Sequence, residues 1–427
     1  MAAARREHEM LRGSAARGEA AGLTEVSPRT LSRTSHRLEG AGRGPTQRSM
    51  RTIYLDYNTT TPVATEVQEA MLPFLGEHFG DPESPHPLGR ACREAVEDAR
   101  LRVARLIGCD RDEIVFTSGG TEANHLALFG TVMHYAPLGN GHLAVSVLEH
   151  ASVRAPAEMF ESFGYGLTHI ECNASGAITP ESVAAAIQPD TILVSIVHAG
   201  QDLGTVQPIR KFANVCHERG VLLHCDAAQT IGKIPVSIPQ LGADLVTLSG
   251  HKMYAPKGIG ALYVRRGVVI EPLFRGGGQE GGLRAGAPNV PHIIALGRAA
   301  AWADEGLEES VAHVGQLRDR LEGQLCEGVG PGLTVLGGGA ERLPNTLSVA
   351  FPDVTGSELL RRTPELCAAA LQPLSPGGGT SGALALGLSP IEASGAVRLS
   401  LGWYTSRSEV DRAAALLLAA WESLTGR

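Results

Sequence analysis

The sequence has no hydrophobic run long enough to cross a bilayer and no strong excess of charge. It contains no stretch of about eighteen unbroken apolar residues, so we expect no transmembrane helix. The net charge is −8 and charged residues make up 19 % of the chain, a balance that gives no indication of nucleic acid or membrane binding. With 427 residues, 43 % of them hydrophobic, the chain is long enough to bury two cores.

The sequence also lacks a disulfide framework and a cysteine metal site. Its seven cysteines are odd in number and widely spaced, without a Cys-x-x-Cys pair. This pattern indicates free thiols in a reducing compartment. We therefore expect a cytoplasmic protein that holds no metal ion.

Residues 1–49 show neither helical nor strand periodicity and are rich in Arg, Ala, Gly and Ser, so we predict that they are disordered. A mitochondrial targeting role stays open, but five acidic residues argue against it, because transit peptides avoid acids. These residues are Glu7, Glu9, Glu19, Glu25 and Glu39. We prefer the hypothesis that translation starts at Met50, directly before a strand-like run over 51–56.

From Met50 onward, short β-branched runs alternate with segments of helical period. This alternation is typical of a mostly parallel sheet covered by helices, in an α/β protein. Six continuous apolar runs predict strands buried on both faces. They are residues 113–116, 143–146, 191–196, 221–224, 245–248 and 260–264.

The rest of the chain predicts a second, smaller α/β domain. A Gly-rich stretch over 275–286 predicts an ordered loop, and a helix over 290–305 follows it. We expect a large domain over 66–304 and a small domain that combines 51–65 with 305–427. In the small domain we predict two strands and a closing helix, at 345–350, 395–400 and 408–424.

The motif Ser249-Gly-His-Lys252 follows the run 245–248 directly. The carboxyl edge of a parallel sheet is where α/β proteins bind ligands, so a lysine there lies next to a ligand site. Partial desolvation at this edge would lower the pKa of the ammonium group and expose a nucleophilic amine. Taken alone, a lysine after a strand is more often a solvated loop residue. Its neighbours decide between these interpretations.

Three other strand ends carry polar groups that suit one cofactor. Asp226 is placed to keep a pyridine nitrogen protonated, although it also suits a helix N-cap. The turn with Gly120 and Thr121 opens a helix whose positive end can hold a phosphate. His150 can stack on a ring or transfer protons near neutral pH. Together with Lys252, these groups predict pyridoxal 5'-phosphate (PLP), carried as a Schiff base on that lysine.

At seven motifs the sequence resembles cysteine desulfurases and selenocysteine lyases of the class V aminotransferase fold. The motifs are Tyr54-Leu-Asp-Tyr-Asn-Thr-Thr-Thr-Pro62, Thr117-Ser-Gly-Gly-Thr-Glu122, Glu149-His150, Asp226-Ala-Ala-Gln229, Ser249-Gly-His-Lys252, Gly277-Gly-Gln-Glu280 and Arg342-Leu-Pro-Asn-Thr346. The resemblance implies the PLP-dependent transferase fold type I, an amino-acid substrate and a homodimer. It also implies a protein that accepts sulfur or selenium.

The resemblance implies a role for each candidate residue. The catalytic residues would be Lys252, His150 and Asp226. The cofactor contacts would be Gly120, Thr121, His150, Gln201, Asp226, Gln229, Ser249, His251 and Lys252. Arg398, with Asn345 beside it, would bind the substrate α-carboxylate, a pairing that suits a bidentate guanidinium group.

The sequence departs from these relatives where their nucleophilic cysteine lies. In the segment Cys367-Ala-Ala-Ala-Leu-Gln-Pro-Leu-Ser-Pro-Gly-Gly-Gly379, the position of that cysteine falls at Leu374. We interpret Cys367 itself as a buried small residue rather than the nucleophile. Gln201 replaces an asparagine expected at the phenolic oxygen of PLP. Ala287 replaces a threonine expected to reach the phosphate across a dimer interface.

Three hypotheses therefore stay open. The first, which we favour, is a lyase that releases selenium or sulfur from L-selenocysteine or L-cysteine without a persulfide on the protein. Selenium suits this better, because a selenol is the more acidic leaving group. The second is another class V reaction, such as transamination or β-elimination. The third is a weakly active PLP-binding relative that serves as a partner in sulfur transfer.

Overall fold

The computed structural model describes residues 52–371 and 382–427, which belong to one compact unit. The predictions for residues 1–49, Met50 and Leu374 lie outside the described residues. Within the described part, no helix combines the length and apolar character needed to span a bilayer.

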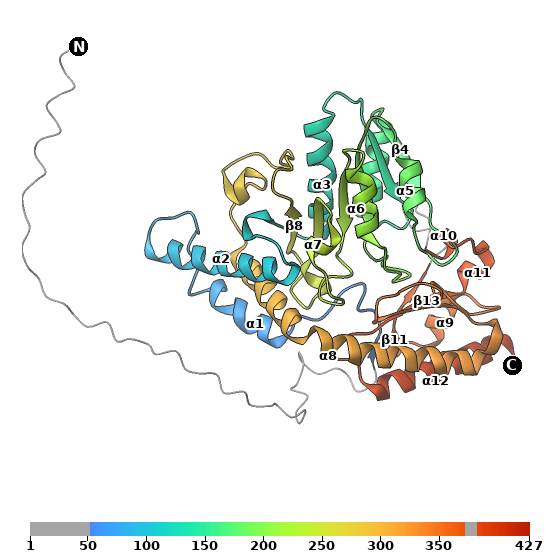
Figure 1. Ribbon diagram of the computed structural model, residues 1–427. Helices are drawn as coiled ribbons and strands as arrows, with labels where there is room; N and C mark the ends of the chain where they lie inside the picture. The colour runs from blue at the N-terminus through green and yellow to red at the C-terminus, as the bar shows by residue number, and fades with distance from the viewer. Residues whose placement is uncertain (1–51, 372–381) are drawn as a thin grey trace, which may run out of the picture. The chain divides into compact units, whose positions relative to one another are not determined.

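A seven-stranded sheet forms the centre of the larger part of the fold (Figure 1). Its strand order is β2-β8-β7-β6-β5-β3-β4, and only β8 runs antiparallel to its neighbours. The strands are β2 (Ile114–Thr117), β3 (His142–Ser146), β4 (Gly166–Ile170), β5 (Thr191–Val197), β6 (Leu222–Asp226), β7 (Leu245–Ser249) and β8 (Gly260–Val264). The predicted mixed, mostly parallel sheet is confirmed.

All six predicted buried strands are present, with ends that differ by two residues at most. Sequence analysis missed β4, at the edge of the sheet. This strand reads Gly-Leu-Thr-His-Ile and is mostly exposed or half-buried, so it lacks the continuous apolar run of a central strand.

Helices cover both faces of the central sheet. They are α1 (Thr65–Met71), α2 (Pro87–Ile107), α3 (Gly120–Tyr135), α4 (Ala151–Ser162), α5 (Pro180–Ala186), α6 (Ile209–His217) and α7 (Ile238–Leu241). Alternate residues of each strand point to opposite faces. Thus Val115 packs with α3 and α4 on one face, whereas Phe116 packs with α2 and α6 on the other. The site-bearing strand ends are therefore held between two packed layers.

The C-terminal part contains a four-stranded antiparallel sheet of order β12-β13-β10-β9. Its strands are β9 (Thr334–Val335), β10 (Thr346–Ala350), β12 (Ala369–Ala370) and β13 (Ala396–Ser400), and β1 (Ile53–Tyr54) pairs separately with β11 (Leu366–Cys367). The helices are α8 (Val290–Val329), α9 (Gly356–Arg362), α10 (Gly382–Ala385), α11 (Pro390–Ser394) and α12 (Arg407–Thr425). The predicted strands β10 and β13 and the closing helix α12 are confirmed.

Helix α8 corrects one prediction, because it runs for 40 residues instead of ending near residue 305. Its first half packs on the large core through Leu296 and Ala300, and its second half packs on a separate core through Leu321 and Leu325. No proline interrupts the helix after its first turn, so nothing in the sequence ends it between the cores. The division into 66–304 and 51–65 with 305–427 stays a prediction.

Candidate active site

A cavity of about 690 Å³ lies at the carboxyl ends of the parallel strands, within the size range of small-molecule sites. It is lined by every residue predicted to contact the cofactor: Gly120, Thr121, His150, Gln201, Asp226, Gln229, Ser249, His251 and Lys252. The two predicted substrate residues are not part of this lining. Asn345 lines a smaller neighbouring cavity together with Lys252, and Arg398 is 2 % exposed.

Lys252 ends a short 3-10 turn (Gly250–Lys252) that follows β7 directly. Its side chain is buried, and this burial, aided by the positive charge of Arg398, lowers the pKa of Lys252 to about 8. The ammonium group donates to the backbone carbonyl oxygens of Asn58 and Thr59, the latter at 2.9 Å. A larger fraction of Lys252 than of an ordinary lysine is therefore a neutral, nucleophilic amine near neutral pH.

Asp226 is the last residue of β6 and is 4 % exposed. One carboxylate oxygen, Oδ1, accepts a hydrogen bond from the backbone N–H of Ala228 at 2.9 Å. The other, Oδ2, accepts from the side-chain amide of Asn124 at 2.8 Å. Both hydrogen bonds fix the orientation of the carboxylate, a group that can hold a proton on a nearby ring nitrogen.

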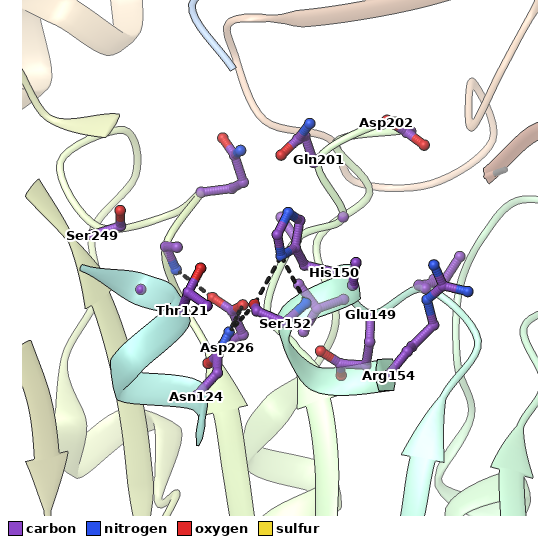
Figure 2. A pocket seen from close by; sticks show the side chains of 18 of the residues that line it. Thr121, Asn124, Glu149, His150, Ser152, Arg154, Gln201, Asp202, Asp226 and Ser249 are labelled. Carbon is purple, nitrogen blue, oxygen red and sulfur yellow. Dashed lines mark hydrogen bonds between the residues drawn. The ribbon is translucent and has the colours of Figure 1, made fainter. Parts of the chain in front are cut away.

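A chain of hydrogen bonds connects Asp226 to His150 through Asn124 and Ser152 (Figure 2). Asn124 donates to both Asp226 and the hydroxyl oxygen of Ser152, the latter at 2.8 Å. His150 caps α4, and its Nδ1 accepts from the backbone N–H of Ser152 at 3.1 Å. Because a backbone N–H can only donate, the neutral ring carries its proton on Nε2.

The imidazole of His150 is poised to stay neutral. Desolvation by the cavity walls lowers the pKa of His150, and the charge of Lys252 acts in the same direction while Asp226 opposes it. Sequence analysis found His150 and Asp226 but not the connecting Asn124 and Ser152. Asn124 follows the phosphate turn in α3, and only its hydrogen bond to Asp226, 102 residues away, identifies it.

The predicted phosphate turn lies at the N-terminus of α3. Gly119 precedes this helix with φ 151° and ψ −179°, a backbone conformation that is essentially restricted to glycine. A Cβ on Gly120 would lie 3.3 Å from the Cβ of Ser249, so the turn and the end of β7 are in contact. The first N–H groups of α3 therefore open beside Ser249 and Thr121, where the helix dipole favours an anion.

Asn58 is a buried hub that sequence analysis missed. Its backbone carbonyl accepts from Lys252 and from the side-chain amide of Gln229. Its side-chain oxygen accepts from Lys233 at 2.9 Å and from Asn345 at 3.1 Å. Burial lowers the pKa of Lys233 well below its usual range. Through these hydrogen bonds, Asn58 fixes the position of the Lys252 side chain.

Arg398 is already paired within the protein. Its guanidinium donates to Asp56 at 2.7 Å and to Asp202 at 3.3 Å, and also to the hydroxyl of Thr59 at 2.7 Å. Its role in substrate binding stays a prediction, and a substrate carboxylate would have to compete with these partners. Neither acidic residue had been assigned a role from the sequence.

The structure corrects the prediction that Cys367 is buried, because its side chain is exposed. Cys367 ends the two-residue strand β11, which pairs with β1. Neighbouring residues of a strand face opposite sides, so the buried Leu366 turns Cys367 outward. All seven cysteines lie in the described residues and are free, as predicted, and none of them lines the 690 Å³ cavity.

Comparison with known proteins identifies the family. The sequence profile of the aminotransferase class-V family matches residues 53–413. The chain belongs to this family. A cysteine desulfurase IscS from Dictyoglomus turgidum is 38 % identical over 372 residues, which cover 84 % of this chain and 92 % of that protein. A cysteine desulfurase from Trichormus azollae is 40 % identical over 372 residues, covering 85 % and 91 %.

Two solved structures agree with this chain in fold. A NifS-like protein has a TM-score of 0.80 and 34 % identity, and the match covers 88 % of this chain and 100 % of that one. SspA in complex with cysteine has a TM-score of 0.72 and 35 % identity, with 83 % and 100 % covered. The predicted fold type I is thereby confirmed.

Members of the aminotransferase class-V family are PLP-dependent, and the cavity of this chain fits that cofactor. The desolvated amine of Lys252, the buried carboxylate of Asp226 and the open helix end beside Ser249 provide three different groups in one space. These are the groups needed for an aldehyde, a pyridine nitrogen and a phosphate.

Proposed function

We propose that this chain is a PLP-dependent lyase that removes selenium from L-selenocysteine or sulfur from L-cysteine and leaves L-alanine. The observation that carries the proposal is the convergence of Lys252, Asp226 and His150 on one cavity. Relatives named cysteine desulfurases, at 38 and 40 % identity, support the choice of substrate class.

In this proposal, Lys252 attaches the cofactor covalently and Asp226 holds the proton on the ring nitrogen. The N-terminus of α3, with Thr121, Ser249 and His251, binds the phosphate. The remaining predicted contacts, Gly120, Gln201 and Gln229, surround the same space. When bound, PLP supplies an electron sink for negative charge that develops at the substrate α-carbon.

The other residues act on the substrate and its protons. His150 would lie against the cofactor ring and would present its Nε2 proton to the cavity, since Nδ1 is engaged with Ser152. Lys252 would supply an amine that can act as a base toward the substrate. Arg398, supported by Asn345, would bind the α-carboxylate after its ion pair with Asp202 or Asp56 has broken.

None of the cysteines in the described residues lines the cavity, so the selenium or sulfur atom would pass to an external acceptor thiol instead of a cavity cysteine. In this step the electron pair of the broken bond stays on carbon, which takes up a proton to give alanine, and the acceptor receives the zero-valent atom. The C–Se bond is weaker than the C–S bond, so selenium needs less help from a protein nucleophile. We therefore propose L-selenocysteine as the better substrate. Direct measurement of alanine formed from L-selenocysteine and from L-cysteine tests this substrate preference. Pyruvate as the main product would overturn the lyase assignment in favour of β-elimination.

A second candidate function is another class V reaction on a different amino acid. It is favoured by the pairing of Arg398 with Asp202 at 3.3 Å, next to the changed residue Gln201. Formation of a keto acid with transfer of the amino group to the cofactor would support transamination. A PLP-binding protein with no turnover of any amino acid would support the third hypothesis, a partner in sulfur transfer.

The assembly and setting of the protein are also proposals. The exposed apolar side chains Leu72, Leu75 and Phe79, together with Ala287 on a nearby shallow cavity, support a homodimer. The seven free cysteines support a reducing, cytoplasmic setting. A protein acceptor for the released sulfur or selenium completes the proposal.

A further inference from the structure

Arg154 lines the same cavity but has no part in the proposed chemistry. It lies on the first turn of α4, after the His150 cap. In Figure 2 its guanidinium lies on one side of His150, whereas Thr121 and Ser249, at the proposed phosphate end, lie on the other. Arg154 is therefore not placed to bind the cofactor phosphate.

The guanidinium of Arg154 has no hydrogen-bond or ion-pair partner among residues 52–371 and 382–427. Glu158, one helical turn further and also on the cavity wall, lies beyond ion-pair distance within this described part. Arg398, in contrast, is held by two carboxylates.

Glu149 is an ionisable neighbour of Arg154 but makes no ion pair with it in the described residues. Its side chain is 5 % exposed, and its Oε2 has no hydrogen-bond partner in the part of the chain that the structure describes. Burial, together with the nearby charge of Asp226, raises the pKa of Glu149 well above its usual range. The charged form of Glu149 is thus disfavoured, and no carboxylate of the described residues lies within ion-pair distance of Arg154 on the cavity wall.

We propose that Arg154 forms an anion subsite that recognises an acidic group on the side chain of the bound amino acid. The class of ligand is an amino acid whose side chain carries a carboxylate. A guanidinium group suits such anions, because its planar N–H groups can donate two parallel hydrogen bonds. The inference rests on the proposed function, since it assumes that an amino acid binds in this cavity.

Equilibrium titration of the PLP-loaded protein tests the subsite without any turnover. L-aspartate and L-asparagine have nearly the same shape and share the α-carboxylate and α-amino groups, so their comparison isolates the side-chain charge. The absorbance change of the bound cofactor reports the Kd of each. We expect the wild-type protein to prefer L-aspartate by about 10- to 100-fold, the value of a charge-assisted hydrogen bond converted to affinity.

Variants then assign the preference to its residue. Arg154→Gln should bind both ligands equally, while Arg154→Lys should keep part of the preference, because it retains charge without the planar fork. Arg105→Gln, which removes an exposed arginine of α2 outside the cavity, is the matched control and should behave as wild type.

The outcomes separate this inference from the proposed function. Equal affinities in the wild type, or a preference that survives Arg154→Gln, would overturn the subsite while leaving the cofactor assignment intact. A protein that forms no absorbance band with PLP would overturn the proposed function, and the inference with it. Loss of the preference only in the Arg154 variants supports both.

Discussion

The candidate site has a cofactor end in the cavity and a proposed substrate end that includes Arg398, outside the cavity lining, and the two ends differ in how completely their polar groups are paired. At the cofactor end, Asp226, Asn124, Ser152 and His150 form one connected chain that sits on strand ends and helix termini. At the substrate end, one arginine, Arg398, is paired twice by the protein itself, while Arg154 on the cavity wall is unpaired among the described residues.

The difference follows from how each end is built. The cofactor end uses residues whose positions are set by the local geometry of a strand and the turn after it. The substrate end is assembled from segments that are far apart in the chain, since Asp56 and Arg398 are separated by 342 residues. The first end is therefore specified by motifs, whereas the second depends on how the C-terminal part packs against the N-terminal segment.

Lys252→Ala should have the largest effect, because it removes the covalent anchor at the cofactor end. We expect complete loss of the absorbance band that PLP forms with the native protein, and a loss of turnover of at least about 100-fold. Spectra and alanine release are the measurements. Lys233→Ala is the control for removing a buried lysine from the same hub, and it should keep the band. A band that persists in Lys252→Ala would contradict the assignment.

Asp226→Asn should have the next largest effect, because it keeps the shape of the side chain but removes its charge. The loss of a charge-assisted hydrogen bond, about 1.5–3 kcal/mol, predicts roughly 10- to 100-fold weaker PLP binding. Equilibrium dialysis against PLP gives the change in Kd. Because Asn124 also donates to Asp226, thermal melting of the cofactor-free variant separates loss of folding from loss of the ring contact. An unchanged Kd in a folded variant would exclude the ring-nitrogen role.

The rate of cofactor attachment should depend on pH, because only the neutral form of Lys252 reacts with the cofactor. Because the pKa of Lys252 is lowered to about 8, its reactive neutral form falls roughly tenfold for each pH unit below that value. The rate at which PLP attaches to cofactor-free protein should rise between pH 6 and 8 and then level off. Arg398→Gln removes a charge that lowers this pKa, so its plateau should move to higher pH. A rate that keeps rising to about pH 10 would indicate a solvated lysine instead.

The cofactor end could be predicted from sequence for a physical reason. A buried strand is a short apolar run, and the polar residue that ends it marks the ligand edge of the sheet, so Asp226 and Lys252 are visible without a structure. Asn58 is not visible in this way, because its contact with Lys252 spans 194 residues. The length of α8 was also missed, since one helix packs on two cores through different residues.

Ser152→Ala tests the bridge between the two catalytic side chains with a smaller effect. Loss of a neutral hydrogen bond, about 0.5–1.5 kcal/mol, predicts a two- to tenfold fall in kcat/KM. The serine hydroxyl supports the unprotonated Nδ1 of His150, so its removal should raise the pKa of His150. The acidic limb of the pH profile should therefore move to higher pH. Ser152→Thr keeps the hydroxyl and should restore the wild-type limb, whereas an unmoved limb in Ser152→Ala would show that the bridge is only structural.

Asp202→Asn should have the smallest effect, and it should improve substrate binding where the other variants impair function. Asp202 competes with the substrate for Arg398 through a 3.3 Å ion pair, but its carboxylate is partly exposed, so the pair is weakly stabilising. Removing its charge should lower the KM for the amino-acid substrate by about two- to fivefold while kcat stays close to wild type. Arg398→Gln is the paired control and should raise the KM instead. If Asp202→Asn also raised the KM, Asp202 would contact the substrate instead of competing with it. The substrate would then bind with the Asp202–Arg398 ion pair in place.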